Sequence, residues 1–130
     1  MSVRVTIVAG PLQRRLEATD DSGEVGAEVV FDGIVRAIEG DATIAALEYE
    51  AYRPMADTEL ERLARRMLER HGLHSVAVWH SVGRVPVGGV SFRLLIRSAH
   101  RKEALKAVDD FIEALKRDVP LWKRPTPPIR

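Results

Sequence analysis

The stretch SAHRKEALKAVDDFIEALKRDVPLWKR, residues 98–124, carries the pattern around which we expect the chain to be organised. Its apolar residues recur at spacings of three and four, which is typical of an amphipathic helix with one packed face. The packed face is expected to consist of Ala104, Leu105, Val108, Phe111, Ile112 and Leu115. We therefore predict a helix over residues 101–117, followed by a turn at Pro120 and a basic segment.

Two cations of this helix fall toward its apolar side when the positions are placed at about 100° per residue. Arg101 projects onto the middle of the apolar arc, and Lys116 lies close to Leu105. A structural role explains Lys116 equally well, because a lysine in the last turn suits the helix dipole and can extend from an apolar edge to water. Cations nevertheless cluster around this one helix: His100, Arg101, Lys116 and Lys123. The cluster favours a functional role.

The length and composition of the chain indicate one folded domain. Its 130 residues suit a single core, and 45% of them are hydrophobic, an ordinary share for a globular protein. We expect the domain to cover residues 1–124 and a proline-bearing tail to cover residues 125–130. The prolines at positions 125, 127 and 128 are expected to exclude regular structure from this tail.

Charge and cysteine content narrow the classes of function. The 20 basic and 19 acidic residues leave a net charge of +1, which argues against nucleic-acid binding through bulk charge. The chain has no cysteine, which excludes a disulfide framework, a thiolate nucleophile and a Cys-bound metal. No apolar run approaches the roughly 20 residues that span a bilayer, and the N-terminus does not read as a signal peptide. We expect a cytoplasmic protein with neither a nucleic-acid nor a membrane partner.

The hydrophobic patterns along the chain predict an α+β fold. Strands are expected over residues 3–8, 27–35, 44–52, 75–80, 85–87 and 90–97, with a turn at 82–84. Gly33 is expected to mark a bulge or a close backbone approach, and the third strand is expected to pair with the second. A short helix is expected over 12–18, and Pro54 and Gly72 should begin and end a longer one. Because strict βαβ alternation is missing, we predict a mixed or antiparallel sheet with helices on one face.

Motifs of the common cofactor and metal sites are absent from the sequence. There is neither a glycine-rich phosphate loop nor an HExxH motif. His71 and His74 lack a third ligand at suitable spacing, so we expect no metal site. His80 lies in a predicted strand and is interpreted as a satisfied core or surface imidazole. The pair Glu48 and Glu50 is interpreted as a solvated strand face.

The remaining candidate site is a set of cations: Arg36, His100, Arg101, Lys116 and Lys123. Arginine binds phosphate through its planar fork, and a helix N-terminus adds backbone N–H donors. A lysine crowded by other cations can act as an acid–base group or form a covalent adduct. From the residues alone, catalysis on an anionic substrate and simple binding of an anion are about equally well supported.

Four motifs make the sequence resemble the large, catalytic subunit of molybdopterin synthase. They occur in that family's order over nearly the whole chain: Phe31-x-Gly33-x-Val35-Arg36, Tyr49-Glu50-Ala51-Tyr52 with Met55-Ala56, Ser98-x-His100-Arg101, and Leu115-Lys116-x-x-Val119-Pro120-x-Trp122-Lys123. Each motif alone is weak evidence, but the four together are specific.

The resemblance implies an enzyme with a defined partner. The implied fold is an α/β hammerhead, a ferredoxin-like sheet with helices on one face plus a small added β part. The implied reaction is sulfur transfer to cyclic pyranopterin monophosphate from the C-terminal thiocarboxylate of a small ubiquitin-like subunit that ends in Gly-Gly. By resemblance, Lys116 and Lys123 are catalytic, and Arg36, His100 and Arg101 bind the substrate. The resemblance implies no metal and no resident cofactor, and a heterotetramer built on a central homodimer.

Overall fold

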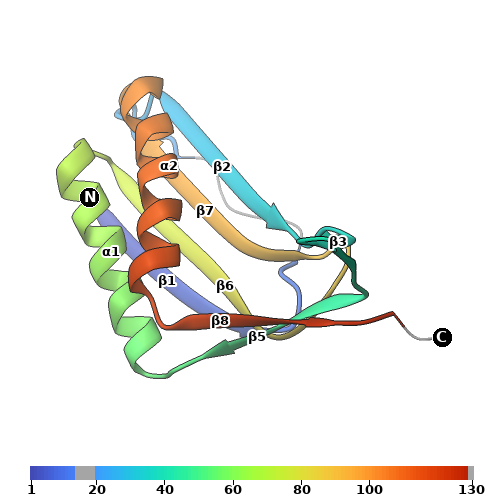
Figure 1. The fold of residues 1–130 in the computed structure, drawn as a ribbon. Coiled ribbons are helices and arrows are strands. Elements are labelled where there is room, and N and C mark those ends of the chain that lie inside the picture. The colour runs from blue at the N-terminus through green and yellow to red at the C-terminus, as the bar shows by residue number, and fades with distance from the viewer. Residues whose placement is uncertain (14–19, 129–130) are drawn as a thin grey trace.

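A computed structural model describes residues 1–13 and 20–128 of the chain. The elements follow the order β1 (Ser2–Ala9), β2 (Ala27–Ile34), β3 (Ile38–Glu39), β4 (Ala42–Thr43), β5 (Ala46–Ala51), α1 (Met55–His71), β6 (Ser75–Pro86), β7 (Val90–Ser98), α2 (Arg101–Asp118) and β8 (Leu121–Thr126). Both helices lie side by side on one face of the main sheet, and β8 continues from the end of α2 (Figure 1). None of the helices formed by the described residues is long and apolar enough to cross a membrane.

The main sheet is mixed and the added β part is a small hairpin. The strands of the main sheet run in the order β2-β7-β6-β5-β8, and β1 pairs with β6. The β1–β6 pair is parallel, and the other pairs are antiparallel. Strands β3 and β4 form a separate two-stranded sheet. The predicted α+β class, with helices on one face and a small added β part, is therefore confirmed.

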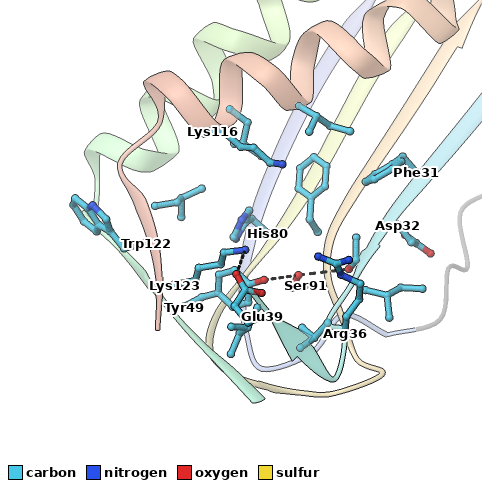
Figure 2. A pocket seen from close by; sticks show the side chains of 18 residues that line it. Phe31, Asp32, Arg36, Glu39, Tyr49, His80, Ser91, Lys116, Trp122 and Lys123 are labelled. Carbon is cyan, nitrogen blue, oxygen red and sulfur yellow. Dashed lines mark hydrogen bonds and ion pairs between the residues drawn. The ribbon is translucent and has the colours of Figure 1, made fainter. Parts of the chain in front are cut away.

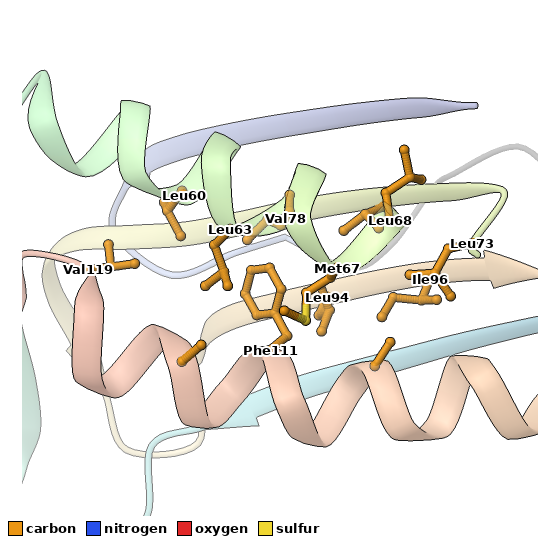
Figure 3. Close-up of a cluster of buried hydrophobic side chains, with 14 of the residues drawn as sticks. Leu60, Leu63, Met67, Leu68, Leu73, Val78, Leu94, Ile96, Phe111 and Val119 are labelled. Carbon is orange, nitrogen blue, oxygen red and sulfur yellow. The ribbon is translucent and has the colours of Figure 1, made fainter. Parts of the chain in front are cut away.

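The core lies between the two helices and the sheet (Figure 3). Alternate residues of β6 and β7 face the helices, because successive side chains of a strand point to opposite faces. The strand contribution includes Val78 and Ile96, while α1 contributes Leu63 and α2 contributes Phe111, all at most 2% exposed. This packing fixes the position of α2 and hence of the residues at its two ends.

The helix over residues 101–117 is confirmed, but its packed face is rotated from the predicted one. The buried residues of α2 are Ala104, Ala107, Phe111 and Ala114, whereas Leu105 is 54% exposed. Small alanines let the helix approach α1 and the sheet closely, so the buried arc is centred on them. At 3.6 residues per turn, Arg101 lies about 100° from that centre. The prediction that Arg101 points into the packed side is therefore wrong, and its side chain is exposed.

Strand β6 is longer than predicted. The expected turn at 82–84 and the separate strand at 85–87 are wrong, because β6 runs without a break from Ser75 to Pro86. Gly83 adopts a φ of +82°, which lets the strand change direction without ending. The first part of β6 pairs with β1 and β7, and the part after the glycine pairs with β5. One strand thus connects the core to the far end of the sheet.

The predicted pairing of the second and third strands is also corrected. β5 pairs with β6 and β8 rather than with β2, because the β3–β4 hairpin separates β2 from β5 along the chain. β2 pairs with β7 instead, and the bulge expected at Gly33 is confirmed by the shift in register there. The helix expected over residues 12–18 falls mostly outside the described residues, and Leu12 forms an isolated bridge with Val90.

The predicted proline-broken tail is a strand as far as Thr126. β8 includes Pro125, which lies opposite Leu47 of β5. β8 is the last strand of the sheet, and an edge strand tolerates a proline because one side of its backbone needs no ladder hydrogen bond. This pairing holds Lys123 against β5, with Tyr49 as its register partner.

An ion-pair cluster connects the two helices and gives a first prediction. Asp110 of α2 lies 2.9 Å from His71 Nε2 and 3.0 Å from Arg70 of α1, and the hydrogen bond with His71 is the main cause that lowers the pKa of the Asp110 carboxyl below 3.8. A carboxyl group with a lowered pKa stabilises the fold at pH values above its ordinary pKa. This stabilisation is lost as the pH falls through the pKa of the folded state. We expect Asp110→Asn to cost about 1 kcal/mol of unfolding free energy at pH 7. In urea titrations at several pH values the deficit should shrink below about pH 4. A deficit independent of pH would contradict this account.

Candidate functional site

A cavity of about 640 Å³ opens at the end of the sheet where α2, β5 and β8 meet (Figure 2). Its walls come from the last turns of α2, the start of β8, the end of β2 and the segment that leads to the β3–β4 hairpin. Phe31, Ile112 and Leu115 give it an apolar lining. A cavity of this size and character suits a small organic ligand.

Three of the five predicted cations line this cavity: Arg36, Lys116 and Lys123. They come from separate parts of the chain, namely the residues after β2, the last turn of α2, and β8. The Lys123 ammonium forms an ion pair with Glu39 at 3.1 Å, whereas Lys116 and Arg36 make no ion pair with any described residue. We call these three residues the cationic rim. Lys116 and Arg36 are thus uncompensated cations beside an apolar cavity, which favours an anionic ligand.

The other two predicted cations lie outside the cavity. His100 precedes α2 and Arg101 begins it, while Lys116 lies in its last turn. Fifteen residues of α-helix separate Arg101 from Lys116, which corresponds to about 22 Å along the axis. The side chain of His100 is 83% exposed, with Nδ1 3.6 Å from Glu103. Within one chain, the structure therefore does not bring all five cations together.

Hydrogen bonds between uncharged groups form the floor of the cavity. The Tyr49 hydroxyl donates to Ser91 Oγ at 2.9 Å, and Ser91 Oγ donates to the Gly33 carbonyl at 3.5 Å. His80 lies beside Tyr49, with ring centroids 5.4 Å apart, and is only 6% exposed. Burial lowers the pKa of the His80 imidazole, and its hydrogen bond with the Ser81 carbonyl opposes this shift. The floor is therefore neutral, in contrast to the rim.

The position of His80 in the strand pattern indicates that its side chain faces a cavity or a polar partner. The interpretation as a core or surface imidazole did not include this. Along β6, His80 has the same parity as Val76 and Val78, which are buried against the helices. A polar residue that continues such a row has to meet a partner or a cavity. Ser91 carried no comparable signal.

The two histidines examined as metal ligands have separate acidic neighbours. His71 contacts Asp110, whereas His74 lies near Asp20 and Glu24. Among the residues that the structure describes, no three histidine or carboxylate side chains are grouped so that they could hold a metal ion.

Known structures share this fold. The chain superposes on a molybdopterin synthase structure from Staphylococcus aureus with a TM-score of 0.84 and 32% identity, over 95% of this chain and 91% of that one. It also matches a chain in a complex of subunits 1 and 2 of molybdopterin-converting factor from Helicobacter pylori, with a TM-score of 0.73 and 27% identity, over 93% and 83% of the two chains.

Sequence comparisons agree. The chain is 32% identical over 124 residues to the molybdopterin synthase catalytic subunit of Pyrococcus abyssi, which covers 93% of this chain and 84% of that protein. It is 39% identical over 99 residues to the protein of that name from Bos taurus, over 76% and 52% of the two chains. The chain thus spans about half the length of its mammalian relatives. The family described as MoaE protein matches residues 7–118, so the chain belongs to the MoaE family.

Proposed function

We propose that this chain is the catalytic subunit of a molybdopterin synthase. In the proposed reaction, sulfur passes to cyclic pyranopterin monophosphate from the C-terminal thiocarboxylate of a small ubiquitin-like subunit. The observation that carries the proposal is the convergence of Lys116, Lys123 and Arg36 on one cavity with an apolar lining. The same residues belong to the motifs on which the resemblance to that family rests.

The charge of the rim suits this reaction. A thiocarboxylate and a substrate phosphate are both anionic, so each turnover brings like charges together. Ammonium and guanidinium groups placed around the reacting atoms offset that repulsion, and fixed charges at an apolar site do so more effectively than water. The chain needs no cysteine of its own, because the sulfur arrives on the partner. The cysteine-free composition is also compatible with the cytoplasmic location that we predict.

The sulfur-carrying partner is proposed to reach the cavity beside β8. A complex of two subunits is known for the Helicobacter pylori relative. Here, β8 is an edge strand and Trp122, next to Lys123, is 57% exposed. An extended tail can hydrogen-bond along a free strand edge, and a Gly-Gly end fits a narrow passage because it has no Cβ atoms. A bulky residue in place of the partner's last glycine is therefore proposed to weaken binding more than a carboxylate in place of the thiocarboxylate.

A second copy of the chain is proposed to supply the two missing cations. His100 and Arg101 lie too far from the rim to serve the cavity of their own chain. Exposed apolar side chains lie along β2, another edge strand: Val30, Phe31 and Ile34, with Ile38 just beyond. An apolar sheet edge is a suitable surface for symmetric pairing. We therefore propose a homodimer in which the His100 and Arg101 of each chain complete the anion site of the other.

Reconstitution with the two proposed substrates tests the function. The chain is mixed with thiocarboxylated partner and cyclic pyranopterin monophosphate, and the dithiolene product is detected after oxidation to a fluorescent derivative. Product is expected only when all three components are present. Binding of the pterin without product would instead indicate an anion-binding module.

The ion pair between Lys123 and Glu39 gives a prediction about affinity. An anionic substrate has to compete with Glu39 for the lysine, so Glu39→Gln should tighten pterin binding. Both side chains are partly exposed, which limits the gain to about fivefold, or 1 kcal/mol. Titration calorimetry at two salt concentrations measures the change. Glu50→Gln is a matched control, because Glu50 pairs with Arg124 and does not line the cavity. Equal affinities for Glu39→Gln and the unmodified protein would contradict competition by Glu39.

A further inference from the structure

His80 is a buried polar residue that the roles proposed above leave unused. It lies in β6 with its imidazole between two aromatic rings, at centroid distances of 5.4 Å from Tyr49 and 5.9 Å from Phe92. It is only 6% exposed, although it lines the cavity. The two rings restrict rotation of the imidazole, so its nitrogens have fixed directions.

The hydrogen bond of Nδ1 determines what Nε2 can do. Nδ1 lies 2.7 Å from the Ser81 carbonyl oxygen, which can only accept, so Nδ1 carries a proton. Burial favours the neutral imidazole. In a neutral ring with a protonated Nδ1, Nε2 is bare and accepts a hydrogen bond.

Nε2 has no acceptor or donor partner among the described residues. This atom forms no hydrogen bond or ion pair with residues 1–13 or 20–128. It is also not one of the fully buried polar atoms that lack a hydrogen-bond partner. His80 is one of the residues that line the cavity, so its imidazole borders the space in which a ligand would lie. In the view of Figure 2, the imidazole lies between Lys116 and Lys123.

We propose that His80 Nε2 is a specificity-determining acceptor, which binds an N–H or O–H donor on the uncharged part of the pterin substrate. This inference rests on the proposed function. The cavity then recognises two ends of one ligand: the rim holds the anionic group and His80 holds a neutral donor. A ligand without that donor displaces water from Nε2 and leaves a buried acceptor unpaired, which costs affinity. Charge at the rim alone gives no such discrimination between anions.

Two substitutions separate hydrogen bonding from packing. His80→Phe keeps an aromatic ring and removes the acceptor, whereas His80→Gln places an amide near the position of Nε2. Titration calorimetry with cyclic pyranopterin monophosphate is expected to show about tenfold weaker binding for His80→Phe and most of the affinity restored for His80→Gln. His71→Gln, which changes a partly buried histidine outside the cavity, is the matched control and should bind normally. Binding of His80→Phe within about twofold of the unmodified protein would overturn the proposal.

A measurement on the unmodified protein avoids any folding defect in the variants. Two-bond ¹⁵N–¹H spectra of the imidazole should show a protonated Nδ1 and a bare Nε2, and the Nε2 signal should move when the pterin is added. Inorganic phosphate, which can occupy only the rim, should leave it in place. An Nε2 signal unchanged at saturating pterin would refute the role of His80 while leaving the proposed function intact. Failure of the unmodified protein to bind the pterin at all would refute both.

Discussion

Lys116→Ala and Lys123→Ala should each reduce the rate of dithiolene formation by at least about 100-fold. Both ammonium groups line the cavity where the anionic sulfur donor and the anionic pterin are proposed to meet. Removing either one leaves like charges uncompensated at the point where charge develops. Both side chains are exposed, so the fold should tolerate the changes with little loss of stability.

Single-turnover assays with saturating partner and pterin measure this effect. Lys106→Ala is a suitable control, because Lys106 is an exposed lysine of the same helix and does not line the cavity. It should retain near-normal turnover. Near-normal turnover in both Lys116→Ala and Lys123→Ala would refute the assignment of the rim as the reaction site.

Mixing two inactive variants should restore activity. If each site takes Lys116 from one chain and Arg101 from the other, a dimer of one Lys116→Ala chain and one Arg101→Ala chain contains one site with both defects and one intact site. Random pairing makes about half of the dimers mixed, so activity should return to about a quarter of the unmodified level. The measurement is the dithiolene yield after the two variants are co-produced.

The matched control is a mixture of Lys116→Ala and Lys123→Ala. These two residues line the cavity of the same chain, so every mixed dimer carries one defect in each site. No activity should return. Equal recovery in the two mixtures, or none in either, would show that His100 and Arg101 do not complete the site of a neighbouring chain.

The parts of the fold that the sequence predicted correctly depend on strong local periodicity. The helix predicted over 101–117 corresponds to α2, and the strand predicted over 90–97 corresponds to β7. The first long helix, α1, ends at Gly72 as predicted. The errors involve tertiary context. Gly83 reads as a turn, but a strand passes through it because β5 and β7 pair on either side of the bend. The tail prolines read as a break, but an edge position in the sheet accommodates Pro125.

The cavity of the candidate site brings together only part of the predicted set of cations, for a similar reason. Arg36, Lys116 and Lys123 line one cavity, but their convergence requires β8 to pair with β5, which no local pattern indicates. The separation of Arg101 from Lys116 was present in the sequence as the length of the helix between them. The prediction of one cluster of cations did not take that length into account. The sequence pattern did not predict the orientation of the packed face of α2. Three alanines, rather than the larger Leu105, make the closest contacts of this helix.

The long-range pairing of the strands affects how the protein is made. Ser2 of β1 pairs with Ser75 of β6, and Ala27 of β2 pairs with Ser98 of β7. On the ribosome, β1 and β2 therefore remain unpaired until these much later strands have been translated. Of the strands described before α1, only β3 and β4 pair with a strand close to them in the sequence. Apolar strands that wait unpaired are prone to aggregate, which creates a demand for chaperones during synthesis. β8 is translated after α2, so premature termination after α2 would leave a chain with both helices and the core strands but without Lys123.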